Sequence, residues 1–342
     1  MITDQEVEDY NALAVSLFKK YESYICNNEK RCDDVNFPVL AAISNLGLMV
    51  KGKNKRRMID IASKLNTSNT FAMTTVISDS ELGDLNKDIK PYVYHVRINQ
   101  NDDENEKQKI IRTANEWVRL KSGGLVRELL TNSDIERFGK NCMNNKSENI
   151  TRLMSIKTLI NCHWYQPQEE STACLSNYGR DECILTPCDY RGDGYVFIAN
   201  IPYTWKPGSM IIYQPHYLHT GRDDFIKILT KLEVPGEFDK FLKSFDKNNT
   251  LSVEMPKFFI RCDSFEFSRF INEERKSYSD CEIFEKDFDI KYLQNYRPKP
   301  KDPIILGRGI GRGHLHIRNK PFLYFALDGS NCIIDAGIQS GY

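Results

Sequence analysis

The stretch ILGRGIGRGHLHIRNKPFLYFAL, residues 305–327, changes character halfway along its length. In its first half, glycine stands at every second position from Gly307 to Gly313, with arginine and isoleucine between. Its second half, PFLYFAL, is aromatic and aliphatic, and it predicts a β-strand. CIIDAGI, residues 332–338, predicts another strand soon after it. The chain should therefore end in two strands, preceded by a segment of different chemistry.

Glycine alternating with arginine suits a phosphate cradle, a nucleic-acid-binding ribbon or an exposed loop. A dinucleotide-binding G-x-G-x-x-G motif is absent, because Arg312 and His314 stand where the third glycine is needed. A nucleic-acid-binding ribbon has suitable local chemistry, but the segment offers only a few cationic side chains to bind phosphates. A flexible exposed loop without a partner remains an open interpretation.

The composition is that of a soluble globular protein, with 40% hydrophobic and 27% charged residues in a chain of 342. The 47 basic and 47 acidic residues give a formal net charge of zero, so no overall field favours nucleic acid or an anionic membrane. Residues 1–24 lack the layout of a signal peptide, and no run of about 18 apolar residues occurs. We expect a cytoplasmic monomer with no membrane partner, and nucleic acid is not a favoured partner.

The first 150 residues favour helices. Apolar residues recur at helical spacing over residues 4–24, and residues 37–50 are so uniformly apolar that they predict a helix buried on all sides. Residues 51–65 begin with a basic run, which we interpret as the solvated start of an amphipathic helix. Another amphipathic helix is predicted within 109–130, stopped by a Gly-Gly pair.

Short apolar runs dominate from residue 151 onward, interleaved with two amphipathic helices at 223–232 and 237–245. Strands are predicted at 70–78, 92–99, 151–164, 194–203, 208–215, 253–262, 321–327 and 332–338. Helices and strands in this order do not alternate strictly, which favours an α+β fold with a mixed or antiparallel sheet. Without a visible repeat or linker, we expect one domain spanning residues 1–342.

No motif predicts an enzyme, a metal site or a cofactor. His216 and His219 are close in sequence, but no third ligand stands near them. Cys183 and Cys188 form at most half of a metal site. No G-x-S-x-G, P-loop or H-E-x-x-H motif is present. The ten cysteines contain no C-x-x-C pair, and we interpret them as free thiols in a reducing compartment.

Seven segments in collinear order resemble the serpin family of protease inhibitors. In the first half these are ALAVSLFKKY, similar to the opening helix, LGLMVKGKNKRRMIDIAS, similar to a helix join, and ANEWVRLKSGGLVRELL. The last resembles I-N-x-W-V-x-x-x-T-x-G-x-I-x-x-L-L, with Trp117 on the pattern. TRLMSIKTLINCHW is similar to a strand motif in which Asn161 and Trp164 are shifted.

The other three segments are IPYTWKPGSMIIYQP, VEMPKFFIRCDSF and NKPFLYFA. They resemble L-P-Y-x-x-x-x-x-S-M, V-x-L-P-K-F and D-H-P-F-L-F-x-I, and they place Pro202, Pro321 and Phe322 on the family's patterns. The resemblance implies three sheets, about seven to nine helices and an exposed reactive loop. It also implies that a protease cuts this loop, which then inserts into the largest sheet. Many family members are secreted, so secretion stays open beside cytoplasmic residence.

The glycine segment stands where such a reactive loop is expected, within residues 295–318, and the chain departs from the family there. No hinge rich in Thr and Ala is present, and three prolines precede the glycines. Alternation places arginines on one face of any inserted strand, which would be costly to bury. From Asp302 to Arg312 the chain also extends only about 33 Å. The family's F-S-P-x-S-I motif is replaced by NFPVLAAIS.

We therefore expect a serpin-like scaffold that has lost loop insertion and acts as a non-inhibitory binding, decoy or regulatory protein. The alternative is an inhibitor of a trypsin-like serine protease, in which Arg308 or Arg312 precedes the scissile bond. Weak nucleic-acid binding is a second alternative. The candidate loop residues are Gly307, Arg308, Gly309, Gly311, Arg312 and Gly313.

Overall fold

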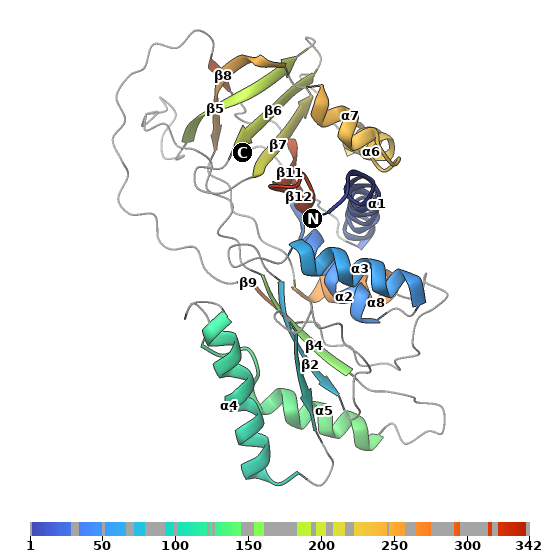
Figure 1. The fold of residues 1–342 in the computed structure, drawn as a ribbon, viewed down its shortest axis with the longest axis vertical. Coiled ribbons are helices and arrows are strands. Elements are labelled where there is room, and N and C mark those ends of the chain that lie inside the picture. The colour runs from blue at the N-terminus through green and yellow to red at the C-terminus, as the bar shows by residue number, and fades with distance from the viewer. Residues whose placement is uncertain are drawn as a thin grey trace. The chain divides into compact units, whose positions relative to one another are not determined.

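The computed structural model of the chain divides into two compact units, each assembled from segments far apart in sequence. It describes residues 2–28, 34–49, 52–65, 72–78, 93–98, 102–121, 124, 127–144, 154–160, 183–192, 196–202, 208–215, 222–244, 246–256, 264–274, 291–294, 314–316 and 321–339. The first unit comprises Met1–Val39, His163–Arg261 and Arg297–Tyr342; the second comprises Leu40–Cys162 and Cys262–Tyr296. The described residues contain eight helices and twelve strands (Figure 1), which confirms the α+β class.

The first unit is built on an eight-stranded sheet in the order β1-β12-β11-β7-β6-β5-β8-β10. Neighbouring strands are antiparallel, except that β10 lies parallel to β8. The strands are β1 (Val35–Phe37), β5 (Cys183–Gly192), β6 (Val196–Pro202), β7 (Gly208–Pro215), β8 (Asp246–Pro256), β10 (His314–His316), β11 (Phe322–Asp328) and β12 (Ile333–Gln339). The two strands predicted at the end of the chain are confirmed as β11 and β12.

Strand β11 is buried from Phe322 to Leu327, and every residue of β12 is buried. Gly337 of β12 lies between Asn36 of β1 and Tyr324 of β11 in the register. The Asn36 amide donates to the Tyr324 hydroxyl at 2.5 Å and to Asp335 Oδ1 at 2.6 Å. A buried carboxylate is costly without hydrogen bonds, and these bonds, with one from the Tyr324 hydroxyl at 3.3 Å, stabilise it.

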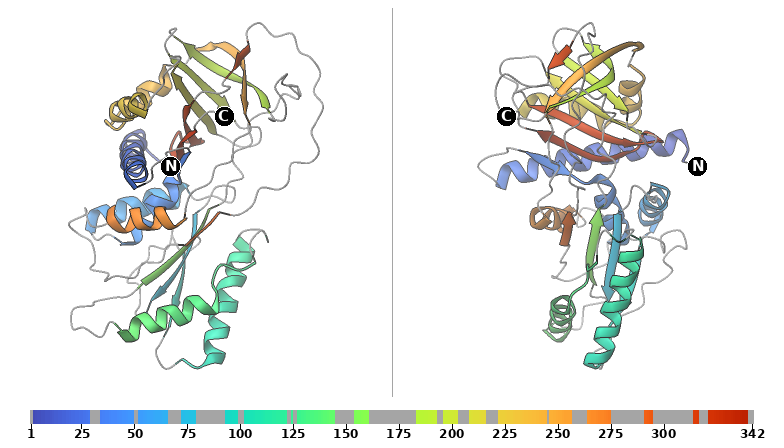
Figure 2. Two further views of the ribbon diagram at one scale, coloured as in Figure 1. Left: turned by 180° about the vertical axis from the view of Figure 1, so that it is seen from behind. Right: turned by 90° about the vertical axis from the view of Figure 1, so that its left-hand side faces the viewer.

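Helix α1 (Asp4–Asn28) lies beside β12, as two further views show (Figure 2). The Tyr10 hydroxyl donates to the carbonyl of Ile333 at 2.8 Å. The Asn11 side chain accepts from the Ile333 amide and donates to the Asn331 carbonyl, both at 2.9 Å. The helix predicted over residues 4–24 is thus confirmed. Its hydrogen bonds satisfy backbone groups at the β11–β12 turn and fix the helix to the hairpin.

Two further helices, α6 (Arg222–Leu232) and α7 (Glu237–Lys243), pack against α1. Glu22 of α1 is buried, and Arg222 binds it through two hydrogen bonds; the Nη2–Oε2 bond is 3.0 Å long. Two-point contact with a guanidinium is the arrangement that best stabilises a buried carboxylate. Both helices were predicted from their amphipathic patterns.

The second unit contains a four-stranded sheet in the order β3-β2-β4-β9. The outer pairs β2·β3 and β4·β9 are parallel, and β2·β4 is antiparallel. The elements are α2 (Val39–Met49), which begins at the boundary with the first unit, α3 (Gly52–Leu65), β2 (Ala72–Ser78), β3 (Val93–Arg97), α4 (Glu104–Lys121), α5 (Asn132–Asn144), β4 (Met154–Ile160), α8 (Ser264–Glu274) and β9 (Lys291–Gln294). The mixed sheet expected for the fold is thus present.

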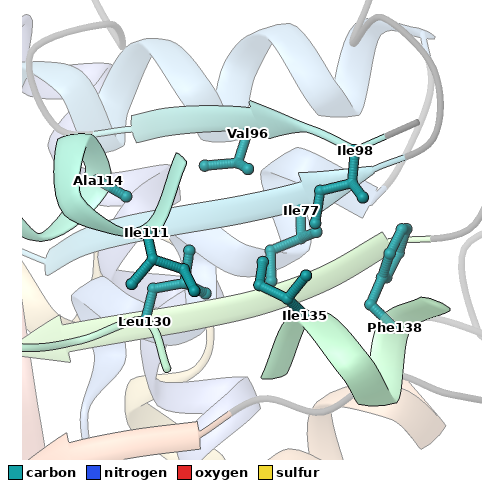
Figure 3. Packing of buried hydrophobic residues seen from close by; sticks show 8 residues of the cluster. All are labelled: Ile77, Val96, Ile98, Ile111, Ala114, Leu130, Ile135 and Phe138. Carbon is teal, nitrogen blue, oxygen red and sulfur yellow. The ribbon is translucent and has the colours of Figure 1, made fainter. Parts of the chain in front are cut away.

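Buried side chains from β2, β3, α4, α5 and the adjoining residues Ile98 and Leu130 form one hydrophobic cluster (Figure 3). It consists of Ile77, Val96, Ile98, Ile111, Ala114, Leu130, Ile135 and Phe138. On α4, the buried positions 111, 114 and 118 follow the spacing of one helix face. The apolar stripe predicted within residues 109–130 therefore packs on the sheet.

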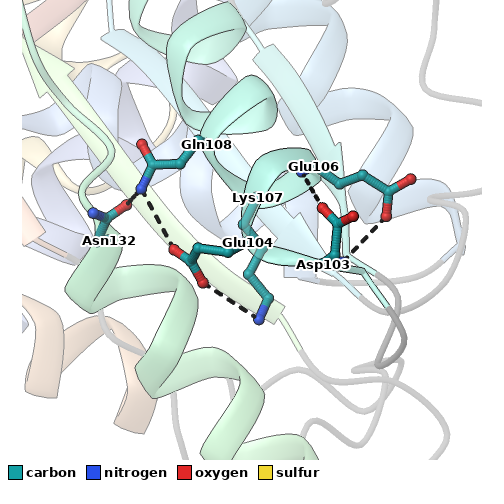
Figure 4. Close-up of polar contacts among 6 residues, drawn as sticks. All are labelled: Asp103, Glu104, Glu106, Lys107, Gln108 and Asn132. Carbon is teal, nitrogen blue, oxygen red and sulfur yellow. Dashed lines mark hydrogen bonds and ion pairs between the residues drawn. The ribbon is translucent and has the colours of Figure 1, made fainter.

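Capping boxes mark the starts of α1, through Thr3 and Glu6, and of α4. At α4, Asp103 and Glu106 exchange two side-chain to backbone bonds, of 2.8 and 3.2 Å (Figure 4). Gln108, one turn further on, donates to Asn132 Oδ1 at 2.7 Å and so joins α4 to the first residue of α5. The helix therefore begins at Glu104 and not at 109, as the predicted range had it.

The structure differs from the predicted elements at several points. Phe37, expected in the buried helix, ends strand β1, because the following Pro38 disfavours helical geometry in the residue before it. Residues 39–49 of that prediction are confirmed as α2, and all its described side chains except Ser44 are buried; Val50 lies outside the described residues. The strand predicted at 253–262 ends at Pro256 within the described residues. The elements β1, β5, β9, β10, α5 and α8 were not predicted.

Candidate functional site

The candidate loop residues, Arg308, Arg312 and the four glycines between Gly307 and Gly313, lie outside the described residues. The structure instead fixes where the loop segment begins and ends. Strand β9 ends at Gln294 and β10 begins at His314, so residues 295–313 connect them. We call these nineteen residues the β9–β10 connection.

Both strands that bound this connection lie at the ends of their sheets, as far as the described residues extend. Strand β9 pairs in parallel with the last four residues of β4, from Lys157 opposite Lys291 to Ile160 opposite Gln294. Strand β10 pairs in parallel with β8, from His314 opposite Ser252 to His316 opposite Glu254. Since β4 already has β2 on its other side, a strand could enter beside β9 only by separating β4 from β9 or by taking the outer edge of β9.

Trp117 is half-buried on α4, and its ring packs on Tyr94 of β3 at a centroid distance of 5.4 Å. This ring contact joins α4 to the sheet of the second unit. Gly124 fulfils its predicted role, because its φ of 83° and its bond to the Arg119 carbonyl at 2.8 Å end α4 in the left-handed conformation that favours glycine.

Asn115 lies in the segment ANEWVRLKSGGLVRELL and was not among the predicted site residues. Its Oδ1 accepts from the amides of Leu129 and Leu130 at 2.9 Å, and its Nδ2 donates to the Leu130 carbonyl at 2.8 Å. One side chain therefore satisfies three backbone groups of the segment after α4. The asparagine two positions before the tryptophan was the available signal.

The remaining motif residues are placed in part. Pro202 ends β6, opposite Ser209 of β7, and Pro321 directly precedes β11. Phe322 is buried as the first residue of β11. Asn161 and Trp164 lie outside the described residues.

The candidate metal residues gain no support. His216 and His219 lie outside the described residues, whereas Cys183 and Cys188 both belong to β5. Five residues along a strand separate their backbones by about 16 Å, too far for one ion. Within the described part of the chain, no three His, Cys, Asp or Glu side chains are grouped to hold a metal. No helix there is long and apolar enough to cross a membrane.

The cysteine prediction is corrected at one position. Cys26 is disulfide-bonded, so the ten cysteines are not all free thiols. Cys332 is a free, buried thiol, and burial together with the nearby Asp328 carboxylate raises its pKa far above the ordinary value. A thiol that stays protonated is a poor nucleophile, so Cys332 is a structural residue.

No protein-family model and no curated protein matches the chain. Solved structures do match over nearly its whole length. A thermophilic serpin, tengpin, in its native state aligns with 100% of this chain and 95% of its own, at 13% identity and a TM-score of 0.54. A native protease nexin-1 with heparin aligns with 97% of this chain and 100% of its own, at 11% identity and a TM-score of 0.52. A tumour suppressing serpin covers 98% and 99%, at 13% identity and a TM-score of 0.55.

Proposed function

Since the chain has a serpin-like fold along its length, we propose that it acts by binding a protein partner, as a decoy or regulator, without trapping proteases by loop insertion. The β9–β10 connection carries this proposal. Its nineteen residues contain three prolines and four glycines, where an inserting loop needs a continuous strand. The fold provides the scaffold, and the sequence of the β9–β10 connection disfavours its insertion into a sheet.

The prolines oppose insertion through hydrogen bonding. A strand entering between β4 and β9 would turn after Gln294 and run antiparallel to β9. With a two-residue turn, positions 297–300 would face β9, and these include Pro298 and Pro300. Residues two apart on a strand direct their backbone groups toward the same neighbouring strand. Pro298 and Pro300 would therefore leave two N–H groups missing from the same hydrogen-bond ladder. Pro303 would interrupt the other ladder.

The glycine segment opposes insertion through burial. Alternation would place Arg308, Ile310 and Arg312 on one face and the glycines on the other. Burying an unpaired guanidinium costs several kcal/mol, and the glycine face would bring no compensating apolar area. An exposed segment avoids both costs and leaves the arginines available to carboxylates of a partner.

Limited trypsin digestion tests the proposal. We expect cleavage after Arg308 or Arg312, located by mass spectrometry, with no rise in the melting temperature of the cleaved protein. The matched control is the double variant Arg308→Ala, Arg312→Ala, which should resist cleavage there and melt like the parent protein. A large increase in melting temperature after cleavage would show that the loop inserts and would refute the proposal.

A protease inhibitor is the second candidate, favoured by the position of both arginines in the connection that replaces a reactive loop. A trypsin-like enzyme pairs such a guanidinium with a carboxylate in its specificity pocket. Without insertion, inhibition would be reversible and competitive. Steady-state assays with trypsin should then show inhibition that Arg308→Ala or Arg312→Ala removes, whereas an SDS-resistant complex would indicate trapping.

A further inference from the structure

Strand β8 leaves its ladder with β5 at one place. Successive residues of β5 pair with successive residues of β8 as far as Asp189, which is opposite Thr250. Tyr190, the next residue of β5, is opposite Asp246, so three residues of β8 are passed over. Extra residues on one strand of an antiparallel pair form a bulge, which leaves the ladder and bends the strand. We call residues 247–249 the β8 bulge.

The other neighbour of β8 does not reach the bulge either. Strand β10 pairs with β8 at residues 252–254. Within the described ladders, the β8 bulge therefore pairs with neither neighbouring strand. Its sequence is Lys-Asn-Asn, between Asp246 and Thr250, and a polar run rich in Asn and Asp is typical of turns and loops. Irregular backbone with such a sequence belongs on the surface of a protein.

The middle residue of the bulge opens a sequon for N-linked glycosylation. Asn248, Asn249 and Thr250 have the pattern N-x-T, with no proline at the middle position. A glycan is bulky and hydrophilic, so a folded chain accommodates one where the acceptor lies at the surface. Other sequons of the chain lie outside the described residues; they begin at Asn66, Asn145 and Asn149. Asn248 is therefore the acceptor that the fold places in an unpaired segment.

The oxidation state of Cys26 is an independent indication of where the chain matures. Cys26, in α1, is disulfide-bonded. Disulfides form and persist in secretory compartments, which are oxidising, and they are rare in the cytosol. N-linked glycans belong to proteins of the same secretory route. The disulfide and the sequon thus indicate one compartment, which is not the reducing compartment expected from the sequence.

We propose that Asn248 carries an N-linked glycan. The donor is an oligosaccharide joined to a lipid through pyrophosphate. The side-chain amide nitrogen of Asn248 forms a bond to the anomeric carbon of the sugar and loses one proton. The bond between that carbon and the pyrophosphate oxygen breaks, and the lipid pyrophosphate leaves with the electron pair. Thr250 supplies the hydroxyl group that completes the sequon.

Site-specific mass spectrometry tests the assignment. The full chain, preceded by a cleavable signal peptide, is produced through the secretory route of a eukaryotic cell. The intact folded protein is treated with peptide N-glycosidase in heavy-oxygen water, which converts a glycosylated asparagine to labelled aspartate. Trypsin then releases residues 248–257, because it cleaves after Lys247 and Lys257. We expect the label at Asn248, and an unlabelled peptide 248–257 would overturn the assignment.

Substitutions within the sequon provide matched controls. Asn248→Gln and Thr250→Val should each lose the glycan. Asn249→Gln and Thr250→Ser retain the pattern N-x-S/T and should keep the glycan on Asn248. If Thr250→Val keeps the sugar on this peptide, the modification is not N-linked glycosylation, and the proposal is wrong.

A proline pair tests the bulge itself. Asn249→Pro places proline at the middle position of the sequon, so the glycan should be lost. The protein should still fold and melt close to Asn248→Gln, which also lacks the glycan, because residue 249 has no ladder partner. Val253→Pro is the contrast: Val253 pairs with both Thr186 and Leu315, and its variant should lose the folded protein. Equal damage from the two prolines would show that residue 249 belongs to the ladder and would overturn the structural basis of the site.

Discussion

Gly337 has no room for a side chain, because the ring of Tyr324 lies over it on the neighbouring strand. A Cβ at this position would stand 2.5 Å from both Cε1 and the hydroxyl oxygen of Tyr324. That oxygen is itself held by Asn36, so the ring cannot move without losing a buried hydrogen bond. We expect Gly337→Ala to lower the free energy of unfolding by about 1–3 kcal/mol, measured by urea denaturation.

The steric cause can be separated from backbone strain. In the double variant Gly337→Ala, Tyr324→Ala, the cost should be less than the sum of the two single costs, because the clash is gone. Gly124→Ala provides a contrast: nothing lies within 4 Å of its Cβ position, but φ is 83°, so about 1 kcal/mol of strain is expected. Strictly additive costs for Gly337 and Tyr324 would contradict the close contact.

Two buried groups predict a loss of stability in alkali. Burial raises the pKa of Cys332 above its ordinary value of 9.0, and that of Tyr10 above 10.0. Above these values the unfolded chain loses both protons while the folded chain keeps them. The unfolded state therefore binds fewer protons, and the free energy of unfolding falls as pH rises. It should stay level up to about pH 8 and decline above about pH 9.

Urea denaturation of the parent and Cys332→Ala, repeated across this range, checks the prediction. The variant should lose the first part of the decline, near the ordinary thiol pKa, and keep the part that begins near pH 10 and belongs to Tyr10. Identical pH profiles for the two proteins would mean that Cys332 ionises equally in the folded and unfolded chains.

At the scale of elements, Asn115 is the residue that ties the segment after α4 to the helix. Asn115→Ala would leave two amides and a carbonyl of Leu129 and Leu130 without their partner. Since both leucines are buried, water cannot replace these bonds without cost. We expect a loss of about 2–4 kcal/mol in the free energy of unfolding. Asn105→Ala, at an exposed position of the same helix, should change stability little, and equal effects of the two variants would contradict this role.

Elements with strong local patterns could be predicted from the sequence. The end strands β11 and β12 have continuous β-branched and aromatic residues, and α1, α4 and α6 have clear apolar stripes. In contrast, β9 has only four residues and is defined by pairing with β4, which lies about 130 residues earlier. A strand this short, formed only by pairing with a distant strand, has no strand pattern in its own sequence.

The missed helix α5 did have a signal. Thr131 and Asp134 form half of a capping box, in which the Thr131 amide and hydroxyl donate to Asp134 Oδ2 at 2.8 and 2.5 Å. The spacing S/T-x-x-D directly before Ile135 and Phe138, which enter the hydrophobic cluster, could have predicted the start of the helix. For the candidate site, the sequence predicted only where the loop segment lies in the chain. It did not predict what the loop binds, because the function of a loop depends on its partner.

At the scale of the whole molecule, the path of the chain links the two compact units. It passes from one unit to the other after residues 39, 162, 261 and 296. Each unit therefore needs segments that are far apart in the sequence: in the first, α1 packs on β12, over 300 residues away, and in the second, β4 pairs with β9. Neither unit is a continuous fragment, so closing the core of one constrains the chain that builds the other.

This interleaving predicts a single cooperative unfolding transition for residues 1–342. In the first unit, Arg222→Leu leaves the buried Glu22 carboxylate without the guanidinium that binds it. In the second unit, Asn115→Ala removes three hydrogen bonds. If folding is cooperative, each variant should lower the protection of both units equally in hydrogen exchange near the unfolding midpoint, read on peptides from β12 and α4. If Asn115→Ala increases exchange in α4 but leaves β12 unchanged, the units unfold separately, and the prediction of a single domain is wrong.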